Sequence, residues 1–117
     1  MLRLVKEGQN RYRVCTPFQF GDGDHLVIVL KSEQPGAWLF SDEGHTYMHL
    51  TYSLNEKDLQ KGNRRAIIAN ALTNFGAVDR NGELIMPVCD GKFGHALYSF
   101  IQVLLKIFDV SARQKKA

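Results

Sequence analysis

The chain lacks most marks of a secreted or membrane protein. Of its 117 residues only Cys15 and Cys89 are cysteines, and they do not form a C-x-x-C pair. Such isolated cysteines are typical of reduced, buried side chains in a cytosolic protein, not of a disulfide framework or a zinc site. The longest apolar run, around FIQVLL, falls far short of the roughly 20 residues that span a bilayer. Because charge interrupts the apolar residues from Arg3 onward, no signal peptide is predicted, and we expect a cytoplasmic protein with no membrane segment.

Several catalytic motifs are also missing. The sequence has no G-x-G-x-x-G or G-x-x-x-x-G-K-[ST] phosphate loop, which removes support for nucleotide-cofactor chemistry. It has no G-x-S-x-G, and neither cysteine lies in an activating context, so a serine or cysteine nucleophile is not indicated. We therefore expect no cofactor, and a non-enzymatic role is favoured over catalysis.

Excess charge of either sign is absent from most of the chain. There are 15 Lys and Arg against 12 Asp and Glu, and the difference of three equals Arg113, Lys115 and Lys116 in the terminal SARQKKA. We expect one neutral domain over residues 1–112, with a basic tail at 113–117. A neutral domain is unlike a nucleic-acid mimic, which would be strongly acidic.

Two similar stretches stand out among the residues that are present. They are FGDGDHLVIVL at 20–30 and FSDEGHTYMHL at 40–50, each with an aromatic residue, Asp/Gly turn chemistry and a histidine. Glycine accepts positive φ and aspartate bonds its own backbone, so both stretches are predicted to contain turns. The apolar residues that follow differ, β-branched in one copy and at helical spacing in the other. We therefore interpret the likeness as shared turn chemistry that leads into different elements.

The first half of the chain predicts an antiparallel meander. RYRVC alternates in polarity and is predicted to be a strand that ends near Pro17, HLVIVLK at 25–31 a central strand, and AWLF at 37–40 the next strand. After the turn at 41–44, Tyr47, Leu50 and Leu54 have helical spacing.

The second half predicts helices and a hairpin. Ser53 and Glu56 match a capping box for a short helix, and Asn63 is the expected N-cap of a helix that ends at Gly76. Asn81–Gly82 between apolar runs predicts a β-hairpin. Residues 95–110 carry a wide apolar stripe and predict a long helix. The sequence thus predicts a single small α+β domain: an antiparallel sheet of meander plus hairpin, packed against two to three helices, with a long C-terminal apolar helix.

His45 and His49 are the first candidate metal ligands. They stand at i and i+4, so on a helix they would share a face, and Asp42, Asp22 or His25 could add a third ligand. The H-E-x-x-H arrangement is not fulfilled, because Thr46 follows the first histidine. The alternative is a pair of ordinary histidines near a helix start, and this alternative is favoured.

Asp22, Asp24 and Asp42 are a second candidate set. If the two Asp/Gly turns converged, these carboxylates could hold Mg²⁺ in a nuclease-like site, with Lys31 assisting. The usual acidic residue two positions before such a lysine is replaced by Val29. Turn aspartates with no metal role are the simpler interpretation.

Charge also suggests surfaces for a partner. Asp22, Asp24, Asp42 and Glu43 would form an acidic edge, and Lys61, Arg64 and Arg65 a basic helix start that could contact phosphates. Either group could also be a solvated face. Nucleic acid is thus a possible partner, but a protein partner is favoured. The helix at 95–110 has apolar residues on more than one side, which suggests a homodimer face or a missing partner.

Three segments carry a resemblance to a known family. TPFQFGDGDHLVIVL, WLFSDEGHTYMHL and RRAIIANALTNFGAVDRNGELIMPV, followed by the long apolar helix, resemble the DUF1828 family over residues 16–110. The signature positions are Phe20, Asp22, Gly23, Asp24, Asp42, Gly44 and Phe75–Gly76. His45 and His49 lie outside this signature.

The resemblance implies a small α+β domain from phage or mobile elements, alone or joined to a second domain. It implies no enzymatic activity or site residue. Together with the composition, it leads us to expect a non-enzymatic protein-interaction or regulatory domain in a defence or anti-defence context. The alternative is a nucleic-acid-binding or metal-dependent nuclease-like protein that uses Asp22, Asp24 and Asp42.

Overall fold

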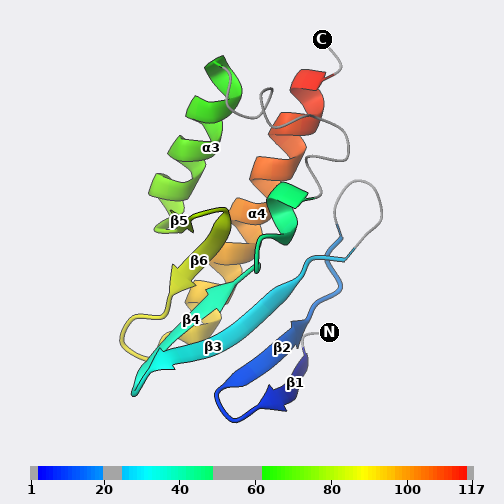
Figure 1. Cartoon of the computed structure of the whole chain (residues 1–117). Coiled ribbons are helices and arrows are strands. Elements are labelled where there is room, and N and C mark those ends of the chain that lie inside the picture. The colour runs from blue at the N-terminus through cyan, green and yellow to red at the C-terminus, as the bar shows by residue number, and fades with distance from the viewer. Residues whose placement is uncertain (1–2, 20–24, 49–61, 116–117) are drawn as a thin grey trace.

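The structure, a computed structural model, describes residues 3–19, 25–48 and 62–115. It contains a six-stranded antiparallel sheet with the order β1-β2-β3-β4-β6-β5, two long helices and a helical turn at 45–48 (Figure 1). The strands are β1 (Arg3–Gly8), β2 (Arg11–Cys15), β3 (Ile28–Gln34), β4 (Ala37–Ser41), β5 (Val78–Arg80) and β6 (Glu83–Pro87). The helices are α3 (Gly62–Phe75) and α4 (Phe93–Lys115). The predicted α+β class is confirmed.

The N-terminal meander forms as predicted and gains one strand. Strands β2, β3 and β4 are consecutive neighbours, with Tyr12 opposite Leu30 and Leu30 opposite Phe40. The predicted strand at 25–31 was placed too early, because β3 begins at Ile28 and His25 makes only an isolated bridge with Gln19. Strand β1 was not predicted. It pairs with β2 at the edge of the sheet, where a strand needs few buried apolar residues.

The predicted hairpin joins β5 to β6. Asn81 and Gly82 both have positive φ, 55° and 92°, which is the backbone of a type I′ turn. Strand β6 also pairs with β4, placing Met86 opposite Phe40, so the hairpin extends the meander into one sheet.

Both long helices occur close to their predicted positions. Helix α3 begins at Gly62, one residue before the predicted cap Asn63, and ends as predicted with Gly76 at φ 79°. The Ala77 N–H donates to the Leu72 carbonyl at 2.8 Å, which is typical of a Schellman C-cap. Helix α4 begins at Phe93 and continues to Lys115, so residues 113–115 of the predicted tail extend the helix.

The core lies between one face of the sheet and the helices. Figure 1 shows α4 crossing behind β4 and β6, while the opposite face of the sheet points toward the viewer with neither α3 nor α4 over it. We call this opposite face the open face. In β3, Ile28 and Leu30 belong to the core, so Val29 and Lys31 lie on the open face. Further core residues include Phe40, Leu84, Met86, Phe100, Val103, Leu104 and Ile107.

Candidate functional site

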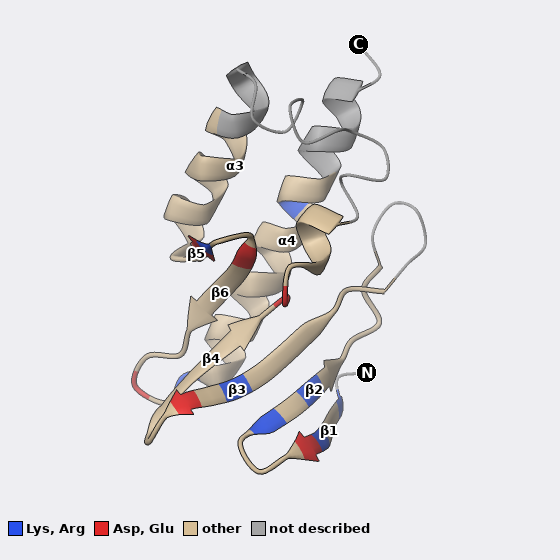
Figure 2. Ribbon diagram, in the orientation of Figure 1, with Lys and Arg blue, Asp and Glu red and all other residues tan. Residues whose placement is uncertain are grey.

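Among the described side chains, the charged ones gather on the sheet and its turns. Figure 2 shows Lys, Arg, Asp and Glu on the strands and their connecting turns, and only Lys106 carries charge among the described side chains of α3 and α4. Because directly opposite residues in an antiparallel pair share a face, Arg11 lies beside Lys31 on the open face. The sheet therefore brings charges from distant parts of the chain together.

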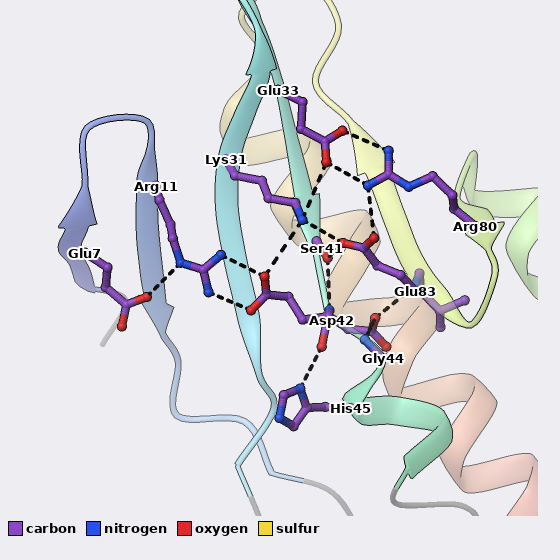
Figure 3. Close-up of polar contacts among 12 residues, drawn as sticks. Glu7, Arg11, Lys31, Glu33, Ser41, Asp42, Gly44, His45, Arg80 and Glu83 are labelled. Carbon is purple, nitrogen blue, oxygen red and sulfur yellow. Dashed lines mark hydrogen bonds and ion pairs between the residues drawn. The ribbon is translucent and has the colours of Figure 1, made fainter.

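A connected set of polar side chains crosses the open face, and we call it the sheet-face network (Figure 3). It consists of Arg11, Lys31, Glu33, Ser41, Glu43, Arg80 and Glu83. Lys31 is at its centre: the Nζ atom lies 2.8 Å from Glu83, 3.6 Å from Glu33 and 3.8 Å from Glu43. Ser41, on β4, donates a hydrogen bond from its hydroxyl to the Glu83 carboxylate. One lysine thus faces three carboxylates.

Two arginines fix the ends of the network by bidentate contacts. Arg11 donates from both terminal nitrogens to Glu43, at 2.7 and 2.6 Å. Arg80 donates to both oxygens of Glu33, at 2.8 Å each, and also to Glu83 at 3.0 Å. Planar fork-to-carboxylate pairs hold both partners in one orientation. The open face therefore presents charges in fixed positions.

These contacts lower the pKa of each carboxyl group in the network. Although burial of Glu83 raises its pKa, hydrogen bonds from Lys31, Ser41 and Arg80 together lower it to about 2. The hydrogen bond from Arg11 lowers the pKa of Glu43, and the one from Arg80 lowers that of Glu33.

The lowered pKa values limit what the network can do chemically. A general acid or base works best with a pKa near the working pH. The Glu83 carboxyl, with a pKa of about 2, stays ionised at neutral pH. The hydrogen bonds that lower the pKa of Glu43 and of Glu33 likewise favour the ionised form of each carboxyl group. The arrangement suits a rigid recognition surface better than proton transfer.

Asp42 has a structural position at the end of β4. Its side chain is fully buried, with 0 % exposed. One carboxylate oxygen accepts from the N–H groups of Gly44 at 2.8 Å and Leu84 at 2.9 Å, and the other accepts from Thr46 at 3.2 Å. The carboxylate therefore caps the helical turn at 45–48 and ties it to β6.

This placement corrects the prediction that Asp42 belongs to an exposed acidic edge. A side chain with no exposed area cannot contact a partner, and its oxygens already accept three backbone hydrogen bonds. The role of Asp42 as a metal ligand stays a prediction. Its neighbour Glu43 was predicted as a binding residue, and it lies half-buried within the sheet-face network. Asp22 and Asp24 lie outside the described residues.

The histidine pair can be assessed at one position. His45 is half-buried in the helical turn, with Nδ1 3.1 Å from the carbonyl oxygen of Asp42, and His49 lies outside the described residues. Within 3–19, 25–48 and 62–115, no group of three or more His, Cys, Asp and Glu side chains could hold a metal ion.

The predicted basic helix start can be located only in part. Arg64 and Arg65 belong to the first turn of α3, and Lys61 lies outside the described residues. The prediction that these three side chains bind phosphate stays a prediction.

The predicted dimer face on residues 95–110 has a different environment from the one expected. Most apolar side chains of α4 are buried within the single chain, including Phe100, Leu104 and Ile107, each with 0 % exposed. Tyr98, with 65 % exposed, is the main exception. The apolar stripe is therefore largely covered by the chain's own sheet and by α3. A homodimer through this helix stays a prediction.

Sequence reasoning missed most of the sheet-face network. Glu33, Arg80 and Glu83 were given no role, although each occupies a polar position in or beside a predicted strand. The available signal was the pairing of strands: a meander that places opposite charges on one face predicts cross-strand ion pairs. Using that signal requires the register, which the sequence does not fix by itself.

Comparison with known proteins gives one match. A family model, the domain of unknown function DUF1828, matches residues 16–107 of the 117-residue chain. The searches of curated proteins and of solved structures found no match. In the described ranges, no helix is long and apolar enough to cross a membrane. The matched segment contains the sheet from β3 onward, the Asp42 cap, α3 and most of α4, and the chain belongs to the DUF1828 family.

Proposed function

We propose that this domain is a non-enzymatic protein-interaction or regulatory module, acting in a phage or mobile-element context, and that its partner binds the open face. The observation that carries the proposal is the sheet-face network. It holds charged groups from β2, β3, β5, β6 and the turn after β4 in fixed positions on a face that neither α3 nor α4 covers. Groups that are already ordered lose little conformational entropy on binding, which favours recognition.

The charge of the network favours a protein over a nucleic acid. Three cations, Arg11, Lys31 and Arg80, face three carboxylates, Glu33, Glu43 and Glu83. A phosphate backbone is attracted by uncompensated positive charge. The network offers little of it, because each cation is already paired.

Apolar side chains on the same face support protein binding. Val78 is 49 % exposed on β5, and Leu39 on β4 is half-buried between Lys31 and Pro87 in the strand register. Apolar contacts beside fixed polar groups are typical of protein interfaces. The partner expected from this pattern is a folded protein with a flat, largely neutral surface.

A pull-down with matched variants tests the proposal. The tagged protein, an open-face variant Val78→Glu and a control Tyr98→Gln/Gln102→Glu would each capture proteins from host cells. The two variants both add one carboxylate and remove one exposed apolar side chain, but on opposite sides of the molecule. Circular dichroism would confirm that all three chains are folded.

We expect at least one protein that binds the wild type and the control but not the open-face variant. The proposal fails if no protein is enriched and nucleic acid alone is recovered. It also fails if capture depends on Tyr98 and Gln102 instead of the open face.

A further inference from the structure

No described strand pairs with the outer edge of β1. Strand β1 lies at one end of the sheet order and pairs with β2 alone among the described strands. Its side chains are mostly exposed, and Leu4 is 55 % exposed. An edge strand presents unpaired backbone N–H and C=O groups, which can extend the sheet by one more strand.

From the order of charges in β1 we infer that this edge pairs with β1 of a second copy of the chain, in an antiparallel dimer centred on Val5. A two-fold axis through Val5 places Arg3 opposite Glu7 of the second copy, and Glu7 opposite the second Arg3. Leu4 then faces the aliphatic stem of Lys6, and Val5 faces Val5. Opposite charges directly across an antiparallel pair stabilise it, and here both ends of the strand gain one.

Other registers of the same two-fold pairing are less favourable. A shift that centres the pair on Lys6 places two lysines face to face, which is destabilising. A shift that centres it on Leu4 pairs only residues 3–5 of the strand and leaves Glu7 without Arg3. Only the register centred on Val5 uses both charged pairs along Arg3–Glu7.

The opposite edge of the sheet does not offer the same complementarity. Strand β5 has three residues, and a two-fold pairing centred on it would place Asp79 against Asp79. The register of β1 shifts at the β-bulge between Lys6 and Gly8, so the proposed ladder ends at Glu7 and does not extend beyond it. Because each copy has one suitable edge, pairing closes as a dimer and does not continue into a fibre.

The dimer would join the two open faces into one surface. Directly opposite residues of an antiparallel pair lie on the same face, so Arg3, Val5 and Glu7 of both copies point to the side that carries the sheet-face network. Glu7 already contacts Arg11 at 3.3 Å and Arg13 at 3.6 Å, so its oxygens are held on this face. The inference does not rest on the proposed function, because it concerns only the edge of β1.

Disulfide trapping tests the register directly. In a Cys15→Ser/Cys89→Ser background, Val5→Cys would place two thiols directly across the axis. Opposite Cα atoms in an antiparallel pair lie about 4.5–5.5 Å apart, within the range of a disulfide. Leu4→Cys is the matched control, because in this register Leu4 faces Lys6 and the two Leu4 positions are diagonal neighbours about 7–8 Å apart.

We expect Val5→Cys to give a covalent dimer on mild oxidation and Leu4→Cys to give little. Sedimentation of the wild type should show a reversible dimer that weakens as salt is raised, because the Arg3–Glu7 pairs are exposed to solvent. Val5→Asp should reduce association by at least about tenfold. Within its own chain the new aspartate faces Arg13, so the fold is retained.

Three results would overturn the inference. The first is a wild-type chain that stays monomeric at the highest soluble concentration. The second is equal cross-linking of Val5→Cys and Leu4→Cys. The third is a dimer that Val5→Asp leaves unchanged while the variant remains folded by circular dichroism, since such a dimer would use another surface.

Discussion

Replacing Asp42 should destabilise the fold more than replacing any exposed carboxylate of the sheet. In the structure the Asp42 carboxylate accepts the N–H groups of Gly44, Thr46 and Leu84. Asp42→Ala removes both carboxylate oxygens and with them all three hydrogen bonds. The N–H groups of Thr46 and Leu84 are in buried hydrogen bonds, and truncation to alanine provides no new partner for them.

The magnitude follows from the number of buried donors. A buried donor left without a partner costs about 1–3 kcal/mol, so two of them cost about 2–6 kcal/mol. That is a large part of the roughly 5–15 kcal/mol that stabilises a typical domain. Asp42→Asn retains one oxygen, which can still accept from Gly44 and Leu84, but its amide would face the Thr46 donor. We expect about half the loss for Asp42→Asn.

Urea unfolding followed by circular dichroism provides the measurement. The matched control is Asp79→Ala, which removes an exposed carboxylate that accepts from Gly82 at 2.8 Å and from the Tyr47 hydroxyl at 3.0 Å. Water can replace Asp79 as a partner, so its loss should cost about 1 kcal/mol. If Asp42→Ala and Asp79→Ala lower the free energy of unfolding by the same amount, the assigned role of Asp42 is wrong.

Three further predictions concern the network and its neighbours. Because the pKa of Glu83 falls from 4.5 to about 2 on folding, its contribution to stability is full above pH 4.5 and is lost as the pH falls toward 2. Glu83→Gln should therefore flatten the loss of stability over that interval in acid titrations of urea unfolding, and an unchanged slope would contradict the assigned contacts. Lys31→Met should cost about 1–3 kcal/mol at neutral pH, because it leaves partly buried carboxylates without their central cation, and Lys31→Met/Glu83→Gln should recover part of the loss. Thr46→Val should be neutral or stabilising in thermal melts, because the Thr46 hydroxyl is buried and has no hydrogen-bond partner in the described part of the chain; a clear loss of stability would show that the hydroxyl has one.

The elements with a strong local signal were predictable from the sequence. Asn81–Gly82 fixes a type I′ turn because both residues tolerate positive φ, and the hairpin appears at that position. The wide apolar stripe of 95–110 likewise predicts a long helix, and α4 contains that range. Local chemistry decides both elements, so no knowledge of the rest of the fold is needed.

Features that depend on distant contacts were not predictable. The Asp/Gly composition of 41–44 predicts a turn, but the bond from the Leu84 N–H to Asp42 joins residues 42 positions apart in the chain. This contact with β6 accompanies the burial of Asp42. The residue therefore belongs to the interior and not, as predicted, to the surface. Strand β1 was missed because edge strands can be almost entirely exposed and charged, which conceals their periodicity.

The sheet-face network depends on register in the same way. Arg11 and Glu43 are 32 positions apart, and Lys31 and Glu83 are 52 apart. Each pair forms across one intervening strand of the sheet: β3 lies between β2 and β4, and β4 lies between β3 and β6. The residue types indicated charged strands, but not which charges meet.

Mapping the bound surface would show directly whether the partner binds the open face. At 13.3 kDa the chain is suitable for amide chemical-shift mapping by NMR, with the protein captured in the pull-down added as the unlabelled partner. We expect the largest shifts in β2, β3, β4 and β6, around Arg11, Lys31 and Glu83. Shifts confined to the exposed side of α4, around Tyr98 and Gln102, would contradict this expectation.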